Sequence, residues 1–310
     1  MIEKKSQHFV RDFLFHPSDI KPDGSSIKAI LRMDENKEGW MGIPHGGIGM
    51  GAVMDLAAAL PAYPADKEAI YPLTVEFRMG GSSVKVGDSL EMTVSEAEGG
   101  AQGIIVGSDE TFPYLSAAIS YTKDDPERRQ LIAAYLPEAF SDMEKSLAEL
   151  PYYKNCFVCG VDRSAPGLKR RFTVGRDRSG EKYLTLATAG LSPDDADTFG
   201  RFQQNGMIHP MAPMAVLDET MGWAGFLASA SGAVTVFISY TFYRPILADE
   251  KLVFFGRVER VRGRPRARVM FWASGGAAAM DDQGRLELVI ASQGQWMGVP
   301  ELTDQMHREL

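Results

Sequence analysis

MGIPHGGIGMGAVMDLAAAL from Met41 and NGMIHPMAPMAVLDETMGWAGF from Asn205 are the two stretches that decide the fold of this chain. They start 164 residues apart in a sequence of 310. In each stretch a Gly and two further residues precede a His, and a helix-length apolar run with a carboxylate inside it follows. An internal repeat of this kind indicates two copies of one structural unit.

Strand patterns follow both apolar helices in the same order. β-branched and aromatic residues alternate with polar ones, and the last strand of each half is rich in small residues. The first half has these strands at 73–79, 90–98 and 114–122, and the second half has them at 233–243, 251–261 and 286–298. The order predicts an α+β fold in which one helix is followed by an antiparallel meander, twice.

The length also favours two domains, since one domain takes roughly 100–200 residues. We expect a first domain at 1–125, a polar helical connector at 126–150 and a second domain at 151–310. The composition, 45% hydrophobic and 24% charged, is typical of globular proteins. Each predicted domain is therefore long enough to bury its own core.

Charge and hydropathy limit the binding partners and the cellular location that we expect. The net charge of −8 gives no general attraction to nucleic acid or to anionic membranes. The N-terminus is charged throughout and shows no secretory signal, so we expect a cytoplasmic protein. The uncharged stretch from Met221 to Tyr243 is long enough to cross a membrane. Because Ser231-Gly232 interrupts it and a strand pattern follows, we expect no membrane insertion.

The two cysteines, Cys156 and Cys159, are too few for a disulfide scaffold. A zinc site would need two more ligands, and the five histidines are scattered without an H-x-x-x-H pair. We therefore expect neither a metal nor another cofactor.

The segment His45-Gly46-Gly47 opens the first apolar helix. The first N–H groups of a helix have no partner within it and lie at the positive end of its dipole. Glycines let a ligand carbonyl approach these donors closely, so we expect the segment to bind and polarise a substrate carbonyl.

The second half resembles a known family through NCFVCGVDRSAPGLKRRF from Asn155, VLDETMGWAGF from Val216 and a strand that ends in Tyr243-Arg244-Pro245. These segments stand in the order found in the PaaI-like and 4-hydroxybenzoyl-CoA thioesterases of the hotdog fold. The resemblance covers most of residues 152–298 and, more loosely, residues 14–122. It implies two tandem hotdog domains, each with a sheet wrapped around one helix, that pair and hydrolyse an acyl-CoA or acyl-carrier thioester. A further homodimer of such chains is expected by the same analogy.

In this family one hotdog contributes the N–H of the first Gly after the His, and its partner contributes a helical carboxylate. The first half matches the donor with Gly46, whereas the second half has Pro210, which has no N–H. The second half matches the carboxylate with Asp218, whereas Asp55 comes one residue late, about 100° around the helix. The resemblance therefore implies one composite site, built from Gly46 and Asp218, and a second site that is inactive.

The expected chemistry assigns a role to each candidate. Gly46 N–H polarises the thioester carbonyl, and Asp218 acts as general base or as nucleophile. The resemblance places Thr235 where a hydroxyl helps to hold the water. Glu219, next to Asp218, completes the set of catalytic candidates, with His45 and Gly47 as substrate-binding residues.

A run of arginines surrounds the turn Gly263-Arg264-Pro265 on an otherwise acidic chain. A solvated hairpin is the usual meaning of such a run. Guanidinium groups also suit the phosphates of CoA, so Arg264 and Arg266 are candidates for binding them.

Two other functions remain open. Pro213-x5-Glu219 resembles the helix start of the β-hydroxyacyl-carrier-protein dehydratases, and His45 could complete a His/Glu pair. Alternatively, the chain is an acyl-CoA-binding module without catalysis, since one of its two sites has already lost its catalytic parts.

Overall fold

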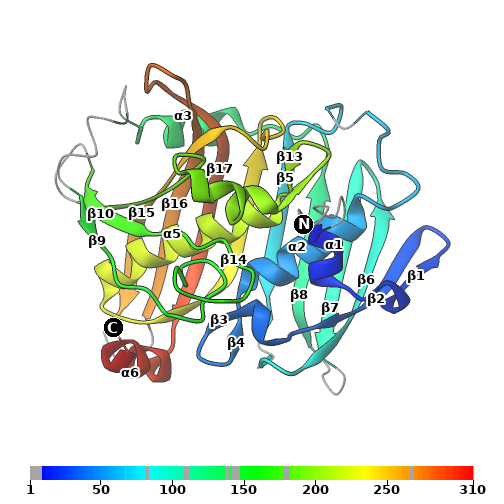
Figure 1. The fold of residues 1–310 in the computed structure, drawn as a ribbon, viewed down its shortest axis with the longest axis horizontal. Coiled ribbons are helices and arrows are strands. Elements are labelled where there is room, and N and C mark those ends of the chain that lie inside the picture. Colours follow the sequence, from blue (N-terminus) through cyan, green and yellow to red (C-terminus); the bar gives the residue numbers. More distant parts are fainter. Residues whose placement is uncertain are drawn as a thin grey trace.

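The computed structural model describes residues 9–66, 68–80, 84–107, 112–136, 140, 147–177, 182–264 and 269–309, with side chains as far as 304 in the last range. An antiparallel sheet of thirteen strands runs through this described part (Figure 1). From one edge to the centre it contains β1 (Ile20–Asp23), β2 (Ser26–Arg32), β6 (Ser89–Ala97), β7 (Gly100–Gly107), β8 (Pro113–Ser120) and β5 (Leu73–Met79). It continues with β14 (Ala233–Phe242), β17 (Leu286–Gly298), β16 (Val269–Met280), β15 (Lys251–Gly263), β11 (Tyr183–Ala189), β10 (Phe172–Arg176) and β9 (Ala148–Glu149).

The two halves of the sheet repeat one topology. In chain order, β2, β5, β6, β7 and β8 occupy the same relative places as β11, β14, β15, β16 and β17. The strand that follows each central helix lies innermost, so β5 pairs with β14 antiparallel at the centre. A buried contact of 3.0 Å between the hydroxyls of Thr74 and Thr241 ties these two strands together. The strands predicted from the sequence therefore form, and they form one continuous sheet.

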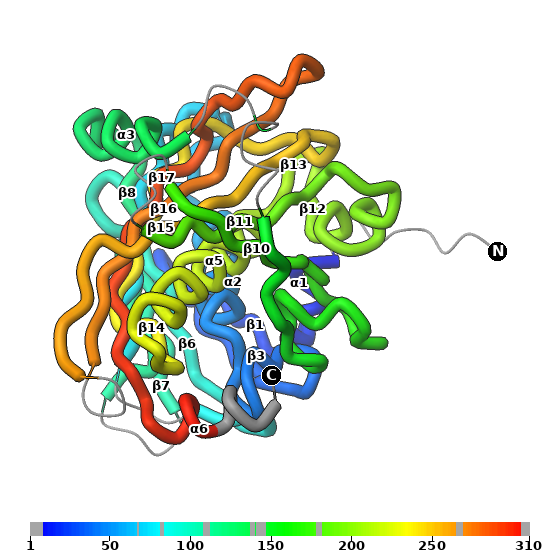
Figure 2. Tube along the Cα trace, turned by 90° about the vertical axis from the view of Figure 1, so that its left-hand side faces the viewer, coloured from blue at the N-terminus to red at the C-terminus, as the bar shows by residue number. Residues whose placement is uncertain are grey.

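One long helix from each half lies on the same side of this sheet (Figures 1 and 2). They are α2 (Gly46–Ala57) and α5 (Met211–Ser229). Every residue of α2 from Gly47 onward is buried, as expected of a helix that is apolar all round. Helix α5 ends at Ser229, the next residue, Ala230, has a positive φ of 51°, and β14 begins three residues after Ala230. The predicted break at Ser231-Gly232 is therefore confirmed.

The two helices cross at very short range. A Cβ placed on Gly47 would lie 2.4 Å from the Cβ of Ala215, and one placed on Gly51 would lie 2.3 Å from the Met211 side chain. The contacts are equivalent by the repeat, since each pairs an early position of one helix with an early position of the other. Glycine at these two positions lets the N-terminal half of each helix reach the other half of the molecule.

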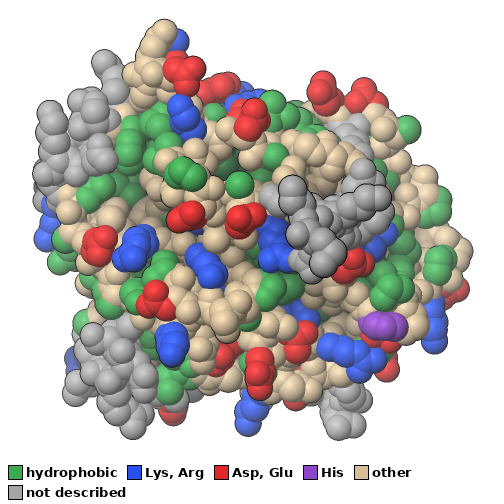
Figure 3. Space-filling view, in the orientation of Figure 1, with side chains coloured by type: hydrophobic (Ala, Val, Ile, Leu, Met, Phe, Trp, Pro, Cys, Tyr) green, Lys and Arg blue, Asp and Glu red, His purple; other side chains and the backbone are tan. Residues whose placement is uncertain are grey.

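Shorter elements surround the sheet and the two helices. They are α1 (Phe9–Leu14), η1 (Pro17–Asp19), η2 (Glu35–Lys37), β3 (Glu38–Trp40), β4 (Ile43–Pro44), α3 (Pro126–Ala133), η3 (Pro193–Ala196), η4 (Phe199–Arg201), β12 (Gln203–Gln204), β13 (Met207–Ile208) and α6 (Pro300–Glu309). None of the helices in the described ranges combines the length and the apolar character that a membrane crossing requires. On the face seen in Figure 3, acidic and basic side chains are interspersed.

The predicted connector contributes α3, which covers the opposite face of the second half-sheet. Ile132 and Leu136 pack there with Val253 and Phe255 of β15. Their neighbours in the strand, such as Phe254, belong to the core under the two long helices. Successive residues of a strand point to opposite faces, so α3 and α5 enclose the second half-sheet between them.

We expect Gly47→Ala to destabilise the protein by about 1–3 kcal/mol, although Ala is the better helix former. The added methyl group would overlap Ala215 and push the helices apart. Denaturant unfolding of the variant and of the double variant Gly47→Ala/Ala215→Gly would measure the effect. The second substitution should restore much of the loss, and equal losses in both variants would contradict a clash at the crossing.

Candidate active site

The start of α2 lies against the second half of the chain. His45 caps the helix, and its Nδ1 accepts the Gly47 N–H at 3.0 Å. Gly46 is the first helical residue, where the N–H has no partner within the helix. A Cβ on Gly46 would lie 3.4 Å from Oδ2 of Asp218. The helix crossing thus brings Gly46 and Asp218, 172 positions apart in the chain, next to each other.

Asp218 lies on α5 and is almost completely buried, with 7% exposure. The Thr235 hydroxyl donates a hydrogen bond of 2.7 Å to its Oδ1, and the Trp296 side chain also hydrogen-bonds to the carboxylate. Burial raises the pKa of Asp218 above its usual value, while the bonds from Thr235 and Trp296 oppose that rise. Since Thr235 occupies Oδ1, Oδ2 is the oxygen that faces Gly46.

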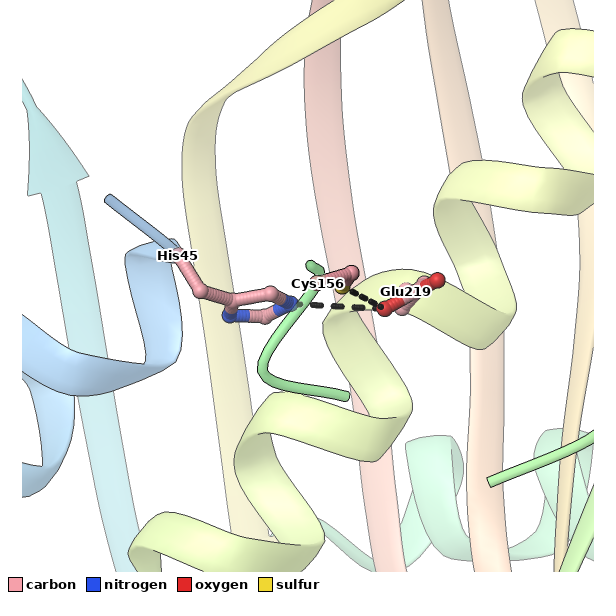
Figure 4. Close-up of side chains that lie close together, drawn as sticks. All are labelled: His45, Cys156 and Glu219. Atoms are coloured by element: carbon pink, nitrogen blue, oxygen red, sulfur yellow. Dashed lines mark hydrogen bonds and ion pairs between the residues drawn. The ribbon is translucent and has the colours of Figure 1, made fainter. Parts of the chain in front are cut away.

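Glu219 points to a different group of side chains (Figure 4). Its Oε2 lies 3.6 Å from Nε2 of His45 and accepts a hydrogen bond of 3.4 Å from the Cys156 thiol. The Cys156 sulfur in turn accepts the N–H groups of Val158 and Cys159. Glu219 therefore ties the start of α2 and the CFVCG turn to α5, beside Asp218.

His45, Cys156 and Glu219 are also residue types that bind metals, and their ligand atoms lie within 4.8 Å of one another. A metal on Nε2 of His45 would require the ring proton on Nδ1. Nδ1, however, accepts the Gly47 N–H, which places the proton of the neutral ring on Nε2, facing Glu219. The geometry of the group favours a hydrogen-bonded cluster over a metal centre.

A cavity of about 520 Å³ opens beside these groups. Five of the candidate residues line it: His45, Gly46, Asp218, Glu219 and Thr235. The rest of its wall is mostly apolar, with large aromatic side chains at Trp40, Tyr114, Trp223, Phe226 and Trp296. Polar groups gathered on one side of an apolar cavity are typical of a small-molecule site.

Two other candidates, Gly47 and Arg264, do not line the cavity. The N–H of Gly47 is bonded to His45, and its Cα packs against Ala215, so Gly47 supports the helix start from behind. Arg264 is exposed at the end of β15, away from the lining of the cavity. Arg266 lies outside the described residues. Binding of substrate by these three residues stays a prediction.

Trp296 is one of the aromatic residues of this site for which the sequence carries no functional signal. It is 2% exposed and stacks on Phe271 at 5.4 Å between ring centroids. The alternating pattern at 286–298 predicts its strand, but the pattern carries no signal for a hydrogen bond to a carboxylate on a distant helix.

The start of α5 is built in the same way as that of α2, with different chemistry. His209 accepts the Met211 N–H at Nδ1, and its Nε2 lies 3.9 Å from Oδ1 of Asp55. Burial lowers the pKa of His209 to about 4. Pro210 has helical backbone angles, φ −52° and ψ −26°, and stands where the first helix has Gly46. The donor is therefore missing in the second half.

Asp55 is the counterpart of Glu219, because each comes ten residues after the His of its own half. The position that matches Asp218 holds Met54. Asp55 is 2% exposed and forms an ion pair of 2.8 Å with Arg11 of α1. The Asp55 carboxylate is engaged in this buried ion pair. At the position of the first half that matches Asp218 there is no carboxylate.

Comparisons with known proteins identify structures with a similar fold. No protein-family model matches the chain, and no curated protein matches its sequence. Solved structures similar to it include a protein of Novosphingobium aromaticivorans provisionally classed as a thioesterase, with 12% identity, a TM-score of 0.57 and coverage of 92% of this chain and 99% of that one. An acyl-CoA thioesterase II of Mycobacterium marinum is 10% identical over 94% and 97% of the two chains, with a TM-score of 0.50.

Two further structures are similar in fold. A protein of Alicyclobacillus acidocaldarius described as having the hotdog fold is 13% identical over 91% of this chain and 96% of that one, with a TM-score of 0.50. The dehydratase domain of the polyketide PpsC of Mycobacterium tuberculosis is 15% identical over 92% and 98%, with a TM-score of 0.51. The chain therefore has an α+β fold of the hotdog type.

We expect Thr235→Val to shift the acid limb of the rate profile to higher pH. The substitution removes a hydrogen bond that lowers the pKa of Asp218, so the carboxyl becomes protonated at a higher pH. A reaction that needs the carboxylate then slows earlier as the pH falls. The pH dependence of kcat measures the shift, with Thr235→Ser as the control that keeps the hydroxyl. A limb that stays in place in Thr235→Val would contradict the role of this bond.

We also expect the purified protein to hold substoichiometric zinc, because the N–H that points at Nδ1 of His45 fixes the wrong tautomer for a metal ligand. Elemental analysis measures the zinc directly. Treatment with EDTA should leave the melting temperature unchanged. One tightly held zinc ion per chain would show that the ring of His45 has the other tautomer.

Proposed function

We propose that this protein hydrolyses acyl-CoA or acyl-carrier thioesters at one composite site between its two halves. The observation that supports this most directly is the meeting of Gly46 and Asp218. A helix-start donor from one half lies next to a buried carboxylate from the other, at the polar side of an apolar cavity. A thioester needs this combination, because negative charge develops on its carbonyl oxygen while a nucleophile attacks the carbon.

The proposed reaction assigns the groups as follows. The carbonyl oxygen of the thioester accepts a hydrogen bond from the Gly46 N–H. Oδ2 of Asp218 takes a proton from a water molecule while the oxygen of that water attacks the carbonyl carbon. The C–S bond then breaks, and the departing thiolate receives that proton. In the alternative course Oδ2 itself attacks the carbonyl carbon, the C–S bond breaks and the thiolate leaves. Water then hydrolyses the resulting anhydride and supplies the proton that converts the thiolate to the thiol. Both courses need the carboxylate, with Thr235 holding Oδ1 and Glu219 holding His45.

The proposal gives one active site per chain. The symmetry-related position combines Pro210, which lacks the donor, with Met54, which lacks the carboxylate. Helix α1 packs against the second half near this position, where Phe9 and Phe13 contact Phe202. Restoring activity there would require a donor at position 210 and a carboxylate at position 54 together.

The repeated strand order supports a division into two tandem hotdog domains, 1–125 and 151–310, with 126–150 between them. In this arrangement the β5–β14 pair and the helix crossing form the interface between the domains. A basic hairpin with Arg264 and Arg266 remains the proposed contact for the phosphates of CoA, and a homodimer of such chains remains part of the proposal.

A dehydratase acting on a 3-hydroxyacyl thioester is the second candidate. It is favoured by the approach of His45 to Glu219 across the two halves and by the similarity in fold to a dehydratase domain. Water addition to a 2-enoyl-CoA distinguishes it from hydrolysis, which releases a thiol. A binding module would show neither reaction, while an acyl-CoA would still raise its melting temperature.

We expect Gly46→Pro to lower kcat/KM about 100-fold or more, because it removes the N–H donor. Proline suits the first position of a helix, and Pro210 shows that this fold accepts it. Gly46→Ala is the matched control, since it adds a similar carbon but keeps the N–H. Thiol release from a panel of acyl-CoAs measures both variants. Equal losses in the two would point to steric blockage and contradict the donor role.

The carboxylate is tested in the same assay with Asp218→Asn, which keeps the shape of the side chain. The companion variant Met54→Leu changes the symmetry-related position and should leave thiol release unchanged. Full activity in Asp218→Asn would exclude this carboxylate as base or nucleophile.

A further inference from the structure

Gly222 is a glycine in the middle of α5 that packing does not explain. Inside a helix, glycine is markedly less favourable than Ala. Elsewhere in the two long helices a short contact justifies it: a Cβ on Gly225 would lie 1.9 Å from the Phe271 ring, and Gly47 and Gly51 sit at the helix crossing. A Cβ on Gly222 would meet no atom closer than 3.8 Å. The position therefore has room for a side chain and has none.

The room at Gly222 belongs to the cavity of the active site. Gly222 is one helical turn after Asp218 and lines the same cavity. The nearest atoms to its missing Cβ are the ring of Phe226 at 3.8 Å and Nε1 of Trp296 at 3.9 Å. Trp296 is also a hydrogen-bond partner of Asp218. The open space thus begins at the reacting carboxylate and continues along aromatic side chains.

We infer that the acyl group of the substrate lies across Gly222, between Trp223, Phe226 and Trp296, and that the size of residue 222 sets which acyl groups are accepted. This inference rests on the proposed thioester hydrolysis. With the thioester carbon between Gly46 and Asp218, the next carbons of the acyl group meet α5 one turn further on. Because glycine has no side chain, the acyl group can pass along the backbone of α5 at this position.

The walls also define the chemistry of that acyl group. The side chains around Gly222 are aromatic, and the neighbouring charges are the carboxylates Asp218 and Glu219. Among the described lining residues Lys85 is the one Lys or Arg, and it is exposed. A carboxylate at the end of the acyl group would be buried without a cation. The site therefore fits uncharged acyl groups that extend several carbons beyond the thioester.

The test compares acetyl-CoA, octanoyl-CoA and succinyl-CoA in the wild type, Gly222→Ala and Gly222→Val. We expect Gly222→Ala to raise the melting temperature by about 2–4 °C, because Ala stabilises the helix relative to Gly and its methyl group overlaps no neighbouring atom. Gly222→Val should lower the ratio of kcat/KM for octanoyl-CoA to that for acetyl-CoA about tenfold or more. Succinyl-CoA should be the poorest substrate of the wild type.

Two controls lie on the same helix. Ala228→Val introduces a branched residue at an exposed position of α5 and should leave the ratio of octanoyl to acetyl activity unchanged. Gly225→Ala should lower the melting temperature, because its methyl group would overlap Phe271. An unchanged octanoyl-to-acetyl ratio in Gly222→Val would overturn the inference while leaving thioester hydrolysis intact.

Failure of the proposed function gives a different result. If the wild type releases no thiol from any ester, binding of the thioether octyl-CoA is measured by calorimetry. Weaker binding to Gly222→Val, with equal binding of free CoA to both proteins, would still support the path across Gly222. Equal binding of octyl-CoA to both proteins would overturn it.

Discussion

The close crossing of the two long helices is the contact on which the rest of the structure depends. It is possible because Gly47 and Gly51 carry no side chain where Ala215 and Met211 approach. Interiors are packed to crystal-like density, so a single added carbon at such a point has to displace one helix. The crossing places the first turn of α2 against the middle of α5. In this way a donor from one half of the chain and a carboxylate from the other come to share one cavity.

The same crossing also explains why the two halves differ in chemistry while they keep one topology. Each helix start has a His that accepts the N–H two residues on. This His faces a carboxylate that comes ten residues after the His of the other half: Glu219 for His45 and Asp55 for His209. The same pairing of a His with a carboxylate therefore occurs in both halves. The groups proposed for catalysis occur only once, because proline and methionine stand at the second copy.

Electrostatics and packing are linked at the proposed site. Burial raises the pKa of Asp218, and the hydrogen bonds from Thr235 and Trp296 counteract that effect. Glu219 is held by the Cys156 thiol and faces the ring of His45. The CFVCG turn is thereby joined to the start of α2 and to α5. Two neighbouring carboxylates on α5 thus have different partners, one facing the cavity and the other holding the elements together.

The sequence by itself determined the repeat, the helix and strand order, and the asymmetry between Gly46 and Pro210, because these follow from local patterns and from the missing N–H of proline. The spacing of ten residues from His to Asp55 and to Glu219 was also present in the sequence. Only the tertiary structure decided which residues meet. The joining of β5 to β14, the indole bond of Trp296 to Asp218, the ion pair of Arg11 with Asp55 and the room at Gly222 all depend on contacts between segments far apart in the chain. A local pattern carries no information about such contacts, because they arise only when the two helices pack against each other.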